Sequence, residues 1–162
     1  MTPASRSQQA AARARMITPI ENPLLEAADA LLRSAVEASR QNERLSRLRQ
    51  KGCREDELKE AAEVCSLSHR LLVERTATYE SIAEQGQGTS DAELWHAANG
   101  VWHAAKEYAR RHHACDALSS KMNKHSSQHL GELTMEYELA ASSLIVMRQA
   151  IAGYRKLRPE AE

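Results

Sequence analysis

The chain has 162 residues, enough to bury one hydrophobic core but too few for two ordinary domains. Helix-favouring Ala, Leu, Glu and Arg are abundant and phenylalanine is absent, so a sheet-rich fold is not expected. The formal net charge is zero and charges of both signs are interleaved, which argues against a nucleic-acid binder with a broad basic face. No apolar run approaches the roughly 18 residues of a membrane-spanning helix.

The first twenty residues contain three arginines and no acidic residue. We interpret residues 1–22 as a disordered basic arm, and a cleaved organellar targeting segment is the alternative. The three cysteines come with no secretory signal, which is typical of reduced thiols in a cytosol-like compartment. We therefore expect a cytoplasmic protein, with organelle targeting through the arm as the alternative.

The first predicted helix covers residues 23–51. Pro23 suits its first turn, where a backbone N–H would have no partner. One face is formed by residues spaced three and four apart, namely Leu24, Ala28, Leu31, Ala35, Ala38, Asn42 and Leu45. Gly52 is the expected C-terminal cap, because glycine adopts the left-handed conformation freely.

The second predicted helix begins near Arg54, where three acidic residues favour a first turn. Its core positions repeat in heptads, with Leu58, Cys65, Leu72 and Tyr79 joined by Ala61, Ser68 and Ile82. The glycines after Gln85 end this helix. Ser90 and Glu93 then have the spacing of a capping box, which predicts the start of the third helix.

The third and fourth predicted helices are separated at the polar segment 122–127. The third buries Leu94, Ala98, Val101, Ala105, Tyr108, His112, Ser119 and Met122, and the fourth buries Leu130, Leu133, Tyr137, Ala140, Leu144, Ile151 and Tyr154. Four helices of about 30 residues over residues 23–158 predict an all-α, antiparallel up-down-up-down four-helix bundle. The alternative joins the last two helices into one rod, since neither Gly nor Pro interrupts segment 122–127.

Several polar residues fall on the predicted core faces. His112 and Asp116 are four residues apart on one helix, so we expect them to pair and to favour protonation of the imidazole. Arg75 and Arg148 are predicted at similar heights near one end of the bundle. They would repel each other there, so they either emerge at the edge of the bundle or bind an anion.

A metal-binding bundle is one functional hypothesis. Potential ligands gather in the middle layers of the predicted bundle, namely Cys65, His69, His112, Cys115 and Asp116. The pairs spaced three or four apart share a helix face and have the chemistry that zinc prefers. A buried cysteine is also common as a small apolar residue, so a purely structural role competes, and no cofactor is the default expectation.

A second hypothesis is histidine phosphotransfer. His96 lies on an exposed helix face and is followed by Gly100, which resembles the exposed histidine of phosphotransfer four-helix bundles. Those modules have a lysine before the glycine, whereas this chain has Asn99. The resemblance implies a phosphoacceptor role for His96.

The leading hypothesis is protein–protein association. The last helix carries a second apolar row opposite its core face, formed by Met135, Leu139, Val146 and Leu157. A bundle helix needs only one buried row, so the second indicates contact with a protein partner or a second copy of the chain. No nucleophile, base and oxyanion-stabilising set is evident. We therefore expect a non-catalytic protein that acts as a homo-oligomer or as an assembly subunit or adaptor.

Overall fold

The computed structural model describes residues 23–85, 91–120 and 127–159. This part of the chain forms four helices and no strand: α2 (Pro23–Lys51), α3 (Glu55–Glu84), α4 (Ala92–Ser120) and α5 (Ser127–Leu157). The all-α prediction is confirmed, and the helix bounds agree with the expected ones to within a few residues. The predicted N-terminal arm, residues 1–22, lies outside the described residues. None of the described helices combines the length and hydropathy that a membrane crossing requires.

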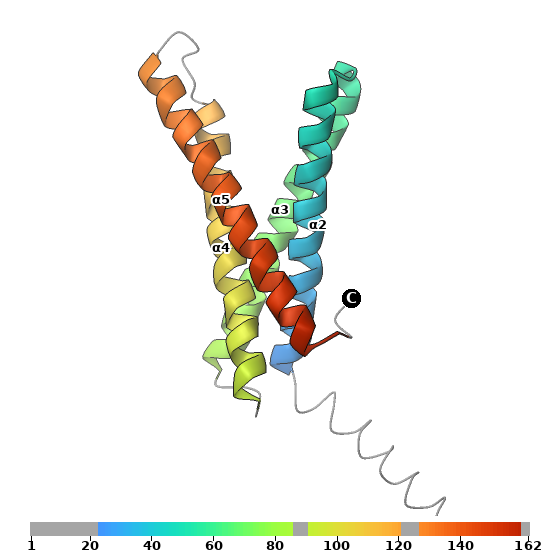
Figure 1. Cartoon of the computed structure of the whole chain (residues 1–162), viewed down its shortest axis with the longest axis vertical. Helices are drawn as coiled ribbons and strands as arrows, with labels where there is room; N and C mark the ends of the chain where they lie inside the picture. Colours follow the sequence, from blue (N-terminus) through green and yellow to red (C-terminus); the bar gives the residue numbers. More distant parts are fainter. Residues whose placement is uncertain (1–22, 86–90, 121–126, 160–162) are drawn as a thin grey trace, which may run out of the picture.

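The helices form two antiparallel hairpins, α2–α3 and α4–α5, that cross each other (Figure 1). The hairpins pack together at the end that holds the start of α2 and the end of α5, and they diverge toward the opposite end. This arrangement confirms the up-down-up-down bundle. The alternative of one continuous final rod is wrong, because α4 ends at Ser120 and α5 runs back alongside it.

Two helix ends follow from local chemistry. Gly52 has a φ of 65°, so it ends α2 in the predicted left-handed conformation. At the start of α4, the Asp91 carboxylate accepts hydrogen bonds from the backbone N–H groups of Glu93 and Leu94, at 3.1 and 3.2 Å. Asp91 is therefore the N-cap of α4 instead of the predicted Ser90, which lies outside the described residues.

The main core lies where the hairpins cross and along their closely packed end. Its largest fully enclosed side chains are Tyr79, Tyr108, Tyr154, Leu24, Leu31, Leu32, Leu72 and Met147. A smaller apolar cluster of Leu45, Ala61 and Cys65 joins α2 to α3 at the diverging end. The heptad positions predicted for α3 are confirmed as its buried or partly buried face.

Some predicted core positions are wrong. Leu130 is 44% exposed and Tyr137 is 48% exposed, and Ser119 is also exposed. They belong to the last turn of α4 and the first half of α5, which lie toward the end where the hairpins diverge (Figure 1). A helical periodicity identifies a face but does not show where along the helix its neighbour ends.

Polar side chains connect the two hairpins. The Arg158 guanidinium donates to both carboxylate oxygens of Asp29 at 2.8 to 3.0 Å, and the Tyr154 hydroxyl donates to the same carboxylate at 2.7 Å. Arg148 donates to the Ser39 hydroxyl at 3.0 Å, whereas Arg75 is exposed. Arg148 is exposed as well, so the two arginines emerge at the surface of the bundle, which is the first of the two predicted alternatives.

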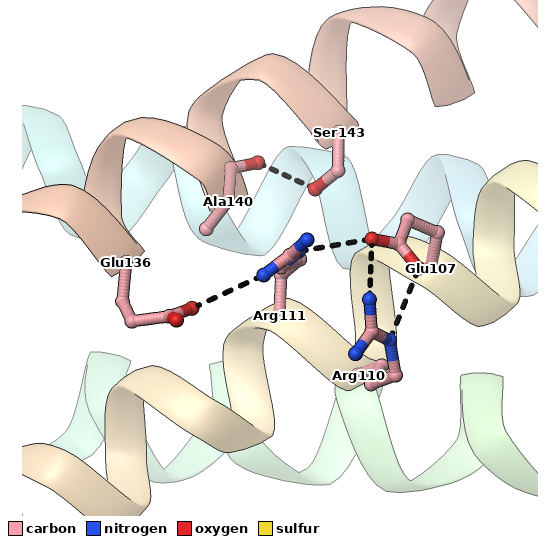
Figure 2. Close-up of polar contacts among 6 residues, drawn as sticks. All are labelled: Glu107, Arg110, Arg111, Glu136, Ala140 and Ser143. Atoms are coloured by element: carbon pink, nitrogen blue, oxygen red, sulfur yellow. Dashed lines mark hydrogen bonds and ion pairs between the residues drawn. The ribbon is translucent and has the colours of Figure 1, made fainter.

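Within the second hairpin, Arg111 bridges α4 to α5 (Figure 2). Its guanidinium lies 2.9 Å from a Glu107 oxygen and 3.6 Å from a Glu136 oxygen. Arg110 contacts the same Glu107 carboxylate. The hydroxyl of Ser143, which is buried, donates to the Ala140 carbonyl at 2.7 Å, so it needs no partner from another helix.

Candidate functional site

A cleft of about 560 Å³ opens between the hairpins just beyond their crossing. Side chains from all four helices line it, including Asn42 and Arg49 of α2, His69 and Arg70 of α3, His112 of α4 and Tyr137 of α5. The cleft contains all five residues predicted as metal ligands, so the structure brings Cys65, His69, His112, Cys115 and Asp116 to one region.

His69 is held by hydrogen bonds at both ring nitrogens. Nδ1 lies 2.6 Å from the carbonyl oxygen of Cys65, and Nε2 lies 2.8 Å from the Tyr108 hydroxyl oxygen. A carbonyl only accepts, so Nδ1 carries the proton, and Nε2 of the neutral ring accepts from Tyr108. Burial lowers the pKa of His69 and raises that of Tyr108, which favours this arrangement of protons.

His112 packs against this pair instead of pairing with Asp116. Its ring centroid lies 4.3 Å from that of His69 and 4.5 Å from that of Tyr108. Burial, followed by the neighbouring His69 and Arg49, lowers the pKa of His112 to about 4. The expectation that Asp116 favours protonation of His112 is therefore wrong: desolvation dominates, and the exposed Asp116 makes no hydrogen bond or ion pair with His112 among the described residues.

The proximity of these groups does not amount to a formed metal centre. Among the described residues, no three His, Cys, Asp or Glu side chains are arranged to hold one metal ion. Burial also raises the pKa values of the Cys65 and Cys115 thiols, which disfavours the thiolate that binds metal. Both nitrogens of His69 are already hydrogen-bonded. Metal binding by this cluster stays a prediction that requires rearrangement.

His96, the predicted phosphoacceptor, lies exposed on α4. A Cβ added at the neighbouring Gly100 would meet no atom within 4 Å, so the surface beside His96 is open. Exposure is a condition for phosphotransfer but is also ordinary for a surface histidine. The role of His96 stays a prediction.

The predicted contact row on α5 lies on the solvent-exposed side of the helix. Met135 is 63% exposed, Val146 53%, Leu157 43% and Leu139 36%. Ile145, which sequence reasoning did not include, is 58% exposed beside this row. The row is therefore not covered by the described part of the chain. Its role as a contact surface stays a prediction.

A second exposed apolar group was missed on α3. Leu67 is 58% exposed and Leu71 is 40% exposed, whereas Val73, 52% exposed, lies on another side of α3 and lines the cleft. Leu67 and Leu71 are four apart and lie off the heptad positions that α3 buries, which is the signal that could have revealed them. They form a shorter row than that of α5.

No protein-family profile, curated protein sequence or solved structure matches this chain.

Proposed function

We propose that the protein is a non-catalytic helical bundle that acts by binding another protein chain through α5. The bound chain in this proposal is a second copy of the same chain, and another subunit of an assembly is the alternative. The observation that carries this proposal is the exposure of large apolar side chains along α5, with Met135 63% and Val146 53% exposed. From here on, the α5 row means Met135, Leu139, Val146 and Leu157.

The physical reason lies in the division of α5 into two faces. One face meets the bundle through Leu133, Ala140, Met147, Ile151 and Tyr154, which are all buried. The α5 row contributes nothing to that core, yet it extends over about 33 Å at 1.5 Å per residue. Isolated surface leucines are ordinary, whereas several large exposed apolar side chains aligned on one side of a helix are typical of a contact site.

Solution mass tests the proposal. The unmodified protein should form an oligomer, and Val146→Glu should shift it to the monomer mass while the far-ultraviolet circular dichroism stays helical. Ala141→Glu is the matched control, because Ala141 is also exposed on α5 but lies on the other side of the helix. It should leave the oligomer intact. A monomeric unmodified protein, or an oligomer unaffected by Val146→Glu, would overturn the proposal.

Metal binding in the cleft is a second candidate function. It is favoured by the Cys65 sulfur, which lies 3.6 Å from Nδ1 of His69, and by the His112 ring packed beside it. A metal ion would have to replace the hydrogen bonds of His69 to the Cys65 carbonyl and to Tyr108. Elemental analysis of the purified protein discriminates the two candidate functions. Stoichiometric zinc or iron in the unmodified protein that is lost in His112→Ala would support metal binding in the cleft.

A further inference from the structure

The outer residues of the α5 row are spaced symmetrically about Val146. Met135 and Leu157 each lie eleven residues from Val146, on its two sides, and Leu139 and Gly153 each lie seven residues away. In an antiparallel pair of identical helices, the two-fold axis is perpendicular to the helices and places each residue opposite one that lies equally far from the axis on the other side. An axis at Val146 would therefore set Met135 against Leu157, and Leu139 against Gly153.

Gly153 leaves room for such a contact. It is exposed, and a Cβ at this position would meet no atom within 4 Å. A large side chain approaching from a second copy would find space there. The pairing of Leu139 with Gly153 thus joins a protruding side chain to an open position, as packing of one helix against another requires.

The charges of α5 are divided between its two halves. Its acidic residues, Glu132, Glu136 and Glu138, all precede Ala140, and its arginines and lysine, Arg148, Arg155 and Lys156, all follow Met147. Glu136 and Arg148 have ion-pair partners within the chain. Glu138 and Lys156 are exposed and make no ion pair among the described residues, so both are available to a second chain.

Helical spacing places Glu138 and Lys156 on the same flank of the α5 row. At 100° per residue, both lie about 80° to the same side of Val146. In an antiparallel helix pair, equivalent flanks face each other, so Glu138 of each copy would lie near Lys156 of the other, offset by about 3 Å along the axis. In a parallel pair, equivalent flanks lie on opposite sides of the contact, so Glu138 would not meet Lys156 of the partner and this attraction would be absent.

We propose that two copies of this chain pair through α5 in antiparallel orientation, about a two-fold axis at Val146. This inference rests on the proposed function and specifies its partner and geometry. The contact is a single pair of helices about 33 Å long, which is at the small end of specific interfaces. A dissociation constant in the micromolar range, roughly, is therefore expected.

Disulfide cross-linking tests the orientation. In a Cys53→Ser background of the full chain, Leu139→Cys and Gly153→Cys proteins are mixed and oxidised, and products are separated on a non-reducing gel. The mixture should give a cross-linked dimer, and neither variant alone should do so. In the antiparallel pair the two copies of residue 139 lie about 21 Å apart along the axis, beyond the reach of a disulfide.

Two controls complete this experiment. Val146→Cys lies at the axis and should cross-link with itself, which shows that oxidation works. Ala141→Cys lies away from the α5 row and should not. Efficient self-cross-linking of Leu139→Cys would overturn the antiparallel geometry while leaving association through α5 in place. A monomeric unmodified protein would overturn both this inference and the proposed function.

Charge exchange is an independent test. Glu138→Lys should weaken the dimer by about tenfold, because each of two symmetric contacts becomes repulsive. Adding Lys156→Glu should return the dissociation constant to within about threefold of the original, since the exchanged charges attract again. Absence of rescue in the double variant would overturn the proposal, and circular dichroism of both variants checks that each is folded.

Discussion

The contact of Asp29 with Arg158 and Tyr154 should be the most sensitive polar link between the hairpins. The side chain of Asp29 is 13% exposed and that of Arg158 is 23% exposed, so water replaces little of what is lost when the pair is broken. Asp29→Ala leaves the Arg158 guanidinium without its two-pronged acceptor and the Tyr154 hydroxyl without its partner. Breaking a largely buried ion pair from one side costs about 3 kcal/mol.

This loss is measurable by denaturation. For a domain of this size, about 3 kcal/mol should lower the melting temperature by roughly 10 °C. Urea unfolding followed by circular dichroism gives the free energy of unfolding directly. Tyr154→Phe removes only one hydrogen bond from the same group and should lose about 1 kcal/mol.

A matched control is Arg54→Ala. Arg54 pairs with Glu57, but their side chains are 77% and 45% exposed. This surface contact should contribute less than about 0.5 kcal/mol. The reasoning is refuted if Asp29→Ala unfolds within about 0.5 kcal/mol of the unmodified protein, since the carboxylate would then not hold the hairpins together.

Two further predictions concern the cleft and the core. The pKa of His112 is about 4 in the folded chain, against 6.5 without burial, so its stabilising contribution is complete above pH 6.5 and is lost as pH falls toward 4. Between pH 7 and pH 4, the free energy of unfolding in urea should therefore fall by about 2 kcal/mol less for His112→Gln than for the unmodified protein. Equal losses would contradict this, and the exposed His103→Gln is the control. Leu72→Ala should destabilise the fold by about 3 kcal/mol, because Leu72 is 0% exposed. Leu67→Ala is the control on the same helix: Leu67 is 58% exposed, so the free energy of unfolding should change by less than about 0.5 kcal/mol. Similar losses for the two variants would be inconsistent with the packing of α3.

Helix positions could be predicted from sequence because their signals are local. The left-handed Gly52, the acidic first turn of α3 and the heptads around Leu72 depend only on neighbours along the chain. The crossing of the hairpins depends on contacts between distant segments. Leu25 and Leu32 illustrate this: both are buried although they lie off the predicted face, since the early part of α2 is enclosed by more than one neighbour.

The sequence predicted which residues gather at the candidate site, but not which contacts they make there. Helical spacing placed Cys65, His69 and His112 in the same layer, and the structure brings them to one cleft. Spacing did not show that Tyr108 would occupy Nε2 of His69, or that His112 would pack on the His69 ring. Those contacts depend on side-chain direction across two hairpins, and burial then determines the pKa shifts.

The divergence of the hairpins follows from a change in side-chain polarity along the bundle. In the main core, Ala35, Ala98 and Ala105 are 0% exposed, and their small size lets the helices approach closely. Beyond it, the facing positions include Asn42, His69, His112 and Arg49, which line the cleft. Burying a polar group without a hydrogen-bond partner costs more free energy than apolar neighbours gain by packing over it. The hairpins therefore separate where these polar groups begin. The exposed apolar side chains of the α5 row lie outside this cleft, on a side of α5 that no described helix covers.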